Sequence, residues 1–216
     1  MGIYIFDFDG TLGNSMPSFV EAWMDLLKEY NIENASEIIK IITPLGYIGA
    51  AKYFIETFKM PYEVDELVSI VQENIYPFYR DKIVLKPGVS ECLKKLKEEG
   101  NSLNVLTASP YRMVAPVLKR CGVYELFDHV WSCEDFNTTK GDPNIYREAI
   151  KRVGGKIEDA VFFDDNLEAL KTAVSAGIYC VGVYDDASID YVEEIKAIVN
   201  RYIYSFNELE VTNYVY

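Results

Sequence analysis

The most constraining feature of the sequence is a regular alternation of strand-like and helix-like segments that begins near residue 88. Short apolar runs rich in β-branched and aromatic residues are separated there by amphipathic segments of about ten to fifteen residues. Such alternation is typical of right-handed βαβ units, whose strands lie side by side in a parallel sheet. The sequence therefore predicts an α/β fold with helices on both faces of a parallel sheet. Beyond residue 88, strands are expected at 103–107, 129–133, 160–164, 178–184 and 202–206.

A long helical segment precedes this alternation. Residues 3–8 (IYIFDF) predict a short buried strand, whereas residues 16–80 have helical spacing with few interruptions. Because this segment leaves after the first strand and returns before the next helix, its two crossings should lie close together on one side of the sheet. We therefore expect two domains, which are a core of residues 1–14 and 84–216 and an all-helical cap of residues 15–83.

The charge balance restricts the possible partners. The chain has 21 Lys and Arg against 34 Asp and Glu, which gives a formal net charge of −13. Nucleic acids and anionic membranes are disfavoured, because no basic stretch could neutralise their phosphates. We therefore expect no nucleic-acid or membrane partner, and we take a monomer as the default state.

The cysteines and the single histidine exclude several other classes. Cys92, Cys121, Cys133 and Cys180 form no C-x-x-C pair, so buried reduced thiols are favoured over a disulfide framework or a zinc site. His129 has no second His or Cys close in sequence, which disfavours Ser–His–Asp and Cys–His catalysis. No signal peptide and no apolar run of membrane-spanning length is recognised, so a cytoplasmic protein is expected.

The first candidate site follows the first strand. Ligands of open parallel sheets bind outside the carboxyl ends of the strands, and residues 7–11 (DFDGT) stand at such an end. If the strand continued through them, Asp7 and Asp9 would face the same side. Two neighbouring carboxylates repel unless a cation lies between them, which suits either a metal site or an acid–base pair. Gly10 permits a sharp turn and a close approach to a ligand.

Three further segments could meet this one at the same edge of the sheet. Thr107 and Ala108 precede a helix and could bind phosphate oxygens, although Thr107 could equally be a plain helix cap. Lys140 could reach a phosphate, although a solvated surface lysine is the simpler interpretation. Asp164 and Asp165 offer hard oxygen ligands for Mg²⁺, and helix capping by Asp165 would explain only one of the two.

Taken in order, these four segments resemble the motifs of the haloacid dehalogenase superfamily of phosphotransferases. Residues 7–12 (DFDGTL) match its first motif in full, and the threonine, the lysine and the acid pair follow in the expected order. The helical insert resembles the C1-type cap of this superfamily. The resemblance therefore implies a Rossmann-like catalytic core, and phosphoglycolate-phosphatase-like and β-phosphoglucomutase-like members as the nearest relatives.

The resemblance also implies a role for each motif residue. Asp7 would be the nucleophile that attacks phosphorus, and Asp9 would be the general acid and base. The phosphoryl group would be bound by Gly10, Thr107, Ala108 and Lys140. The Mg²⁺ cofactor would be held by Asp7, the main-chain carbonyl of Asp9, Asp164 and Asp165, and Asp165 aligns better with the family's acid than Asp164 does.

Two observations choose among the activities of the superfamily. Its dehalogenases lack the second aspartate of the first motif, so Asp9 favours phosphoryl transfer. Its β-phosphoglucomutase-like members carry a histidine early in the first cap helix, where Phe19 stands here. The resemblance thus implies a Mg²⁺-dependent phosphatase acting on a small phosphate monoester, with residues 44–47 forming the specificity loop. A phosphomutase of the β-phosphoglucomutase type and a non-catalytic binding protein on the same fold are the alternatives.

Two positions depart from the family pattern. Gly13 and Asn14 replace the usual pair of a hydrophobic residue and Asp, which bears on the hinge into the cap. Gly141 stands where the family usually has Pro beside the lysine, which bears on the geometry of the lysine loop.

Overall fold

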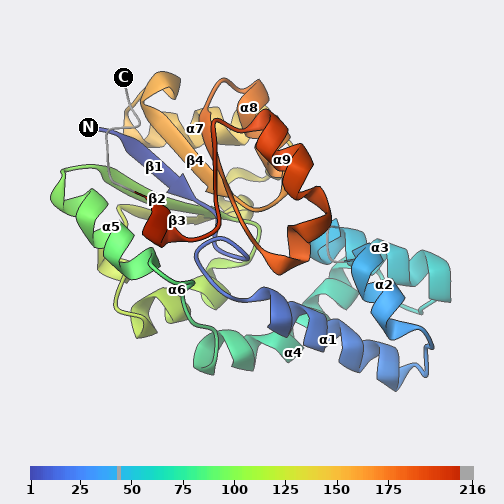
Figure 1. Ribbon diagram of the computed structural model, residues 1–216. Helices are drawn as coiled ribbons and strands as arrows, with labels where there is room; N and C mark the ends of the chain where they lie inside the picture. Colours follow the sequence, from blue (N-terminus) through green and yellow to red (C-terminus); the bar gives the residue numbers. More distant parts are fainter. Residues whose placement is uncertain (43–44, 210–216) are drawn as a thin grey trace. The chain divides into compact units, whose positions relative to one another are not determined.

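The computed structural model describes residues 1–42 and 45–209 (Figure 1). The chain divides into two compact units, each of which is described by itself. Unit 1 joins Met1–Asn14 to the chain from Val84 onward, and unit 2 is the intervening stretch Ser15–Ile83.

A parallel sheet of six strands forms the centre of unit 1 within the described residues, in the order β3-β2-β1-β4-β5-β6. Every residue of β1, β2 and β4 is buried, as apolar strands covered on both faces should be. The predicted parallel α/β sheet is therefore confirmed. The strands are β1 Ile3–Phe6, β2 Ser102–Thr107, β3 His129–Ser132, β4 Ala160–Asp164, β5 Tyr179–Val183 and β6 Arg201–Ile203.

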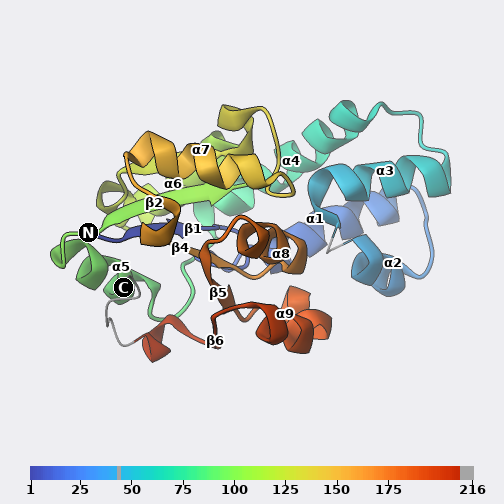
Figure 2. The ribbon, with the colours of Figure 1, turned by 90° about the horizontal axis from the view of Figure 1, so that it is seen from above.

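Helices cover both faces of the sheet, as predicted. Ile3 and Ile5 of β1 face a cluster that includes Ile150 of α7 and Leu170 of α8. On the other face, the ring centroids of Phe6 and Phe206 are 6.4 Å apart. Phe206 begins a short 3₁₀ turn, and α5 packs against this turn. Figure 2 shows α7 and α5 on opposite sides of β1. The helices of this unit are α5 Val89–Glu98, α6 Tyr111–Arg120, α7 Pro143–Val153, α8 Leu167–Ser175 and α9 Val192–Ile198.

The first strand is shorter than predicted. β1 ends at Phe6, and the chain then turns back so that the Gly13 N–H donates to the Phe8 carbonyl at 2.7 Å. Gly10 takes a φ of +79° within this turn, a conformation that glycine adopts without strain. The condition under which Asp7 and Asp9 would face the same side is therefore not met, and strand alternation does not decide where the side chain of Asp9 points.

The two chain crossings between the units lie side by side within unit 1. The Asn14 N–H donates to the Val84 carbonyl at 2.9 Å, and the Lys86 N–H donates to the Leu12 carbonyl at 2.8 Å. A side chain at Gly13 would place its Cβ 2.7 Å from the Phe8 ring. In this structure the Phe8 ring therefore leaves no room for a larger side chain at position 13.

Unit 2 is helical throughout its described part. Trp23 and Phe54 are fully buried, with ring centroids 4.7 Å apart, and Phe19 packs against Trp23 at 6.2 Å. The prediction of an all-helical insert after the first strand is confirmed. Its helices are α1 Met16–Glu29, α2 Ala35–Ile42, α3 Gly46–Phe58 and α4 Val64–Asp81.

The cysteines form no disulfide bond in the structure. All four cysteines are free, and three of them are buried, whereas Cys121 is partly exposed, contrary to the expectation of four buried thiols. Burial raises the pKa of Cys92 and of Cys180 to about 12, so both thiols stay protonated.

In the part of the chain that the structure describes, no helix combines the length and apolarity needed to cross a membrane.

Candidate active site

Three aspartates meet at the carboxyl ends of β1 and β4. The two strands are paired in register, with Phe6 opposite Phe163, so the residues that follow Phe6 and Phe163 are brought together. The Asp7 N–H donates to the Phe163 carbonyl at 2.9 Å and extends this pairing by one residue. Each of Asp7, Asp164 and Asp165 is buried, and each offers a carboxylate oxygen within 4.8 Å of the others. The fold thus gathers acids that lie far apart in the sequence.

Lys140 lies within this cluster. Its Nζ is 2.6 Å from Asp7 Oδ1 and 2.7 Å from Asp164 Oδ2, and its side chain is only 13% exposed. The Tyr146 hydroxyl, from α7, donates to the main-chain carbonyl of Lys140 at 2.9 Å and helps to fix the loop. Interpretation of Lys140 as a solvated surface residue is therefore wrong.

Without a further cation, burial and mutual repulsion disfavour the charged forms of the acids in this cluster. Burial raises the pKa of Asp7 to about 8, because the attraction of Lys140 does not offset burial together with the repulsion of Asp164 and Asp9. Burial also raises the pKa of Asp165 well above its usual range, with Asp164 and Asp7 adding to the effect. Although burial disfavours its charge, Asp164 and Asp7 raise the pKa of Lys140 well above normal.

The donor set fits a divalent cation that prefers oxygen ligands. If all are ionised, the three carboxylates and the one ammonium group carry a formal charge of −2. Mg²⁺ in proteins commonly binds one or two carboxylates together with substrate phosphate and water. The residues present therefore match the predicted cofactor in charge and in ligand type.

The side chain of Asp9 has different partners from that of Asp7. Its Oδ2 accepts a hydrogen bond from the Ser109 hydroxyl at 2.6 Å and a longer one from the Thr107 hydroxyl at 3.4 Å. The Ser109 N–H in turn donates to Thr107 Oγ1 at 3.0 Å. Helix α6 begins only at Tyr111, so Thr107 is not its cap. Ala108, between Thr107 and Ser109 in the sequence, is exposed.

Gly10 and Thr11 pack directly against Asp165. A Cβ at Gly10 would lie 2.6 Å from Asp165 Oδ2, and the Thr11 hydroxyl donates to Asp165 Oδ1 at 3.1 Å. The N-terminus of α8 is capped by Asn166, whose Oδ1 accepts from the N–H groups of Glu168 and Ala169. The interpretation of Asp165 as the helix cap is therefore wrong, and its carboxylate belongs to the acid cluster.

The sequence interpretation missed two charged residues beside the cluster. The Nζ of Lys86 donates to the main-chain carbonyl of Gly10 at 2.6 Å and to Asp185 Oδ2 at 3.0 Å. Both side chains of this ion pair are largely buried. Asp185 lies two residues after Val183, the last residue of β5. The rule that ligands bind at the carboxyl ends of parallel strands could therefore have indicated it. Lys86 stands at no strand end, and its sequence context gave no signal.

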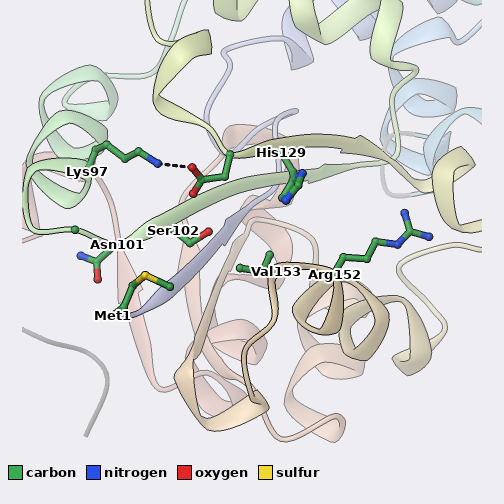
Figure 3. A pocket seen from close by; sticks show the side chains of 9 residues that line it. Met1, Lys97, Asn101, Ser102, His129, Arg152 and Val153 are labelled. Carbon is green, nitrogen blue, oxygen red and sulfur yellow. Dashed lines mark hydrogen bonds and ion pairs between the residues drawn. The ribbon is translucent and has the colours of Figure 1, made fainter.

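The opposite edge of the sheet has a separate hollow of about 400 Å³. It is lined by residues at the amino ends of β2 and β3, among them Ser102 and His129 (Figure 3). The His129 ring stacks on Trp131 with centroids 4.5 Å apart. The acid cluster is at the carboxyl ends of the strands, so this hollow and the single histidine do not belong to it.

The family follows from comparison with known proteins. A family model described as haloacid dehalogenase-like hydrolase matches residues 4–183. The chain belongs to this family. It is 27% identical over 181 residues to validoxylamine A 7'-phosphate phosphatase of Streptomyces hygroscopicus subsp. limoneus, covering 84% of each chain. It is 29% identical over 187 residues to phosphoglycolate phosphatase of Mannheimia succiniciproducens, covering 82% of this chain and 83% of the relative.

Solved structures of the haloacid dehalogenase-like family share the fold. A β-phosphoglucomutase of Clostridium difficile matches with a TM-score of 0.80 at 18% identity, covering 98% of this chain and 94% of that one. At this identity the likeness concerns the fold alone. The predictions of the family and of a phosphatase-type hydrolase are confirmed, whereas the role of each site residue stays a prediction.

Proposed function

We propose that this family member is a Mg²⁺-dependent phosphatase that hydrolyses a small phosphate monoester through an aspartyl phosphate on Asp7. The observation that carries the proposal is the position of Asp7, a buried carboxylate 2.6 Å from the Lys140 ammonium and clustered with two further acids. A cytoplasmic location and a monomeric state are part of the proposal, and the free cysteines agree with a reducing compartment.

The metal would be held by Asp7, the main-chain carbonyl of Asp9, Asp164 and Asp165. When bound, Mg²⁺ shields negative charge on the acids and on the phosphate ester. Thr11 and Asn166 would keep the ligands oriented, because the Thr11 hydroxyl donates to Asp165 and the Asn166 N–H donates to Asp164 Oδ1 at 2.8 Å.

In the first chemical step, a carboxylate oxygen of Asp7 attacks phosphorus and the bond to the ester oxygen breaks. Asp9 gives its proton to the leaving oxygen, which departs as an alcohol. In the second step, Asp9 takes a proton from a water molecule that attacks the same phosphorus. The phosphorus–oxygen bond to Asp7 breaks, inorganic phosphate leaves, and both carboxyl groups return to their starting states.

Four groups would bind the phosphoryl oxygens during both steps. The Lys140 ammonium neutralises charge, while the Thr107 hydroxyl and the main-chain N–H groups of Ala108 and Gly10 offer hydrogen bonds. The hydrogen bond from Ser109 to Asp9 would hold the acid–base carboxyl in one orientation.

Residues 15–83 would be the cap domain that selects the substrate. Residue 44 of the expected specificity loop 44–47 lies outside the described residues. The ring centroids of Tyr47 and Phe19 are 5.1 Å apart. Phe19 is 4% exposed, so it is a core residue without an acid–base group, which favours a phosphatase over a phosphomutase. The sequence relatives are named for phosphorylated small molecules, which supports a small phosphate monoester.

Hydrolysis of an aryl phosphate tests the proposal. Phosphate release by the wild-type chain should require Mg²⁺ and should disappear in Asp7→Asn. Folded wild-type protein that releases no phosphate from the aryl ester or from a panel of sugar phosphates would contradict it. Transfer of phosphate within a sugar phosphate, without release, would instead favour the mutase.

A further inference from the structure

The described residues next to the acid cluster include a second buried lysine, Lys86, which has no role in the steps above. Its side chain is 14% exposed and that of its ion-pair partner Asp185 is 7% exposed. An isolated buried charge is costly, so a lysine kept in this position needs a compensating set of partners.

The ammonium group of Lys86 uses its full donor capacity within the fold. Its three N–H groups match three acceptors, which are the main-chain carbonyls of Gly10 and Tyr184 and the Oδ2 of Asp185. A saturated ammonium has no donor left for a substrate phosphate. Lys86 therefore differs from Lys140, whose partners are the carboxylates of the cluster itself.

These contacts join three chain segments, one of which packs against Asp165. Lys86 belongs to the segment that pairs with Leu12, Asp185 follows β5, and Gly10 packs against the Asp165 carboxylate. Because Lys86 fixes the carbonyl of Gly10, it also restricts the neighbouring Thr11, which donates to Asp165. The contacts form a continuous path from Lys86 to an expected metal ligand.

We propose that Lys86, held by Asp185, is a positioning residue that fixes the turn at Gly10 and thereby holds Asp165 in the geometry that binds Mg²⁺. This inference rests on the proposed function, since it assigns Asp165 to the metal. The Lys86–Asp185 ion pair carries no net charge, so we expect it to affect Mg²⁺ binding through the geometry of the ligands. Loss of residues that orient metal ligands typically weakens metal binding or activity by about 10–100-fold.

Calorimetric titration of Mg²⁺ into the substrate-free protein tests the proposal. Lys86→Met should weaken Mg²⁺ binding by at least about 10-fold. If Lys86 acted only through its charge, removing a cation beside the acids would instead tighten the binding. If Lys86 served only the stability of the fold, Lys86→Met would lower the melting temperature and leave Mg²⁺ affinity unchanged. Either of these two results would overturn the proposal.

The double variant Lys86→Met/Asp185→Asn serves if the single variant does not fold, because it leaves no unpaired buried charge. The introduced asparagine side chain could still accept from the Ala187 N–H, as Asp185 does at 3.0 Å, and the same weakening of Mg²⁺ binding is expected. Lys97→Met is the matched control. Lys97 forms an ion pair with Asp128 at 2.5 Å at the opposite edge of the sheet, and its loss should leave Mg²⁺ affinity unchanged (Figure 3).

Failure of this proposal can be told from failure of the proposed function. Wild-type protein that binds Mg²⁺ but releases no phosphate would contradict the proposed function, and the variants would still decide the role of Lys86. Wild-type protein that is an active phosphatase, with unchanged Mg²⁺ affinity in Lys86→Met, would contradict the positioning role alone. Absence of Mg²⁺ binding by the wild type would overturn both.

Discussion

The Nζ of Lys140 lies 2.6 Å from Oδ1 of Asp7, although 133 positions separate the two residues in the chain. The sheet brings them together, because Asp7 follows β1 and the loop of Lys140 leads into α7. A buried cation at this distance lowers the charge repulsion between the Asp7 carboxylate and an anionic ester. This contact is the basis of the proposed nucleophilic role of Asp7.

Replacement of Lys140 should therefore reduce turnover strongly. Lys140→Met removes the cation that faces both Asp7 and the transferring phosphoryl group, and kcat/KM should fall by about 10²–10³-fold. Lys151→Met is a suitable control, since the Lys151 side chain is 81% exposed. Steady-state kinetics at saturating Mg²⁺ measures the effect, and a change of less than about threefold would exclude the assigned role.

Gly10→Ala should disturb the cluster more than its backbone strain alone would. The new Cβ would meet Asp165 Oδ2 at 2.6 Å in a turn with a φ of +79°. Gly100 has a φ of +80° with no neighbouring atom within 4 Å, so Gly100→Ala carries the backbone strain without the clash. Each variant should lose about 1–2 kcal/mol of folding stability, because a residue with a Cβ is strained in the left-handed conformation. Only Gly10→Ala should also lose Mg²⁺ affinity and activity, and equal Mg²⁺ binding by both variants would contradict the account.

Asp7→Asn should stabilise the metal-free protein, and increasingly so at higher pH. The folded pKa of Asp7 is raised to about 8 from an ordinary value of 3.8, so the folded state binds this proton more tightly than the unfolded state. Stability is therefore lost as pH rises between these two values, by at most about 1.4 kcal/mol per pH unit. Asn has no proton to lose, so its advantage over wild type should grow from pH 5 to pH 8.

Urea unfolding in EDTA at several pH values measures this difference. Asp190→Asn is the control for loss of a carboxylate outside the cluster, because Asp190 is exposed. An Asp7→Asn variant less stable than wild type at pH 8 would indicate that Asp7 serves the fold. Added Mg²⁺ should reverse the order, because it stabilises the wild type through ligands that the variant has partly lost.

Ser109→Ala should impair acid–base catalysis and leave the cluster intact. The variant removes the 2.6 Å hydrogen bond to Asp9, and hydrogen bonds to charged groups contribute about 1.5–3 kcal/mol. We expect kcat to fall by about 10–100-fold with little change in Mg²⁺ affinity. The Ser109→Thr variant should restore part of the rate. Equal activity of Ser109→Ala and wild type would show that this contact does not orient Asp9.

Much of the core could be predicted because its signals are local. Apolar runs such as 160–164 are buried on both faces, so β4 matches its predicted bounds. The end of β1 could not be predicted, because the turn after Phe6 depends on Gly13 returning to the Phe8 carbonyl. The run of residues 3–8 contains five apolar residues, which suggests a longer strand, and its sequence does not record the contact that turns the chain after Phe6.

The candidate site was predictable where its residues follow strands. Asp7, Asp164 and Asp165 could be grouped from the rule for open parallel sheets, and the buried position of Lys140 could not. Lys86 was missed because its partners, Gly10 and Asp185, are separated from it by 76 and 99 positions. A sequence pattern records neither contact, and both depend on the packing of three separate segments.

Borohydride trapping tests the central claim most directly. An aspartyl phosphate is an acyl phosphate, which borohydride reduces to homoserine, and peptide mass spectrometry identifies the modified position. Wild-type protein quenched with borohydride during turnover should carry homoserine at position 7, and Asp7→Asn treated in the same way should carry none at that position. Turnover of the wild type with position 7 unmodified, or with the modification at another aspartate, would contradict Asp7 as the nucleophile.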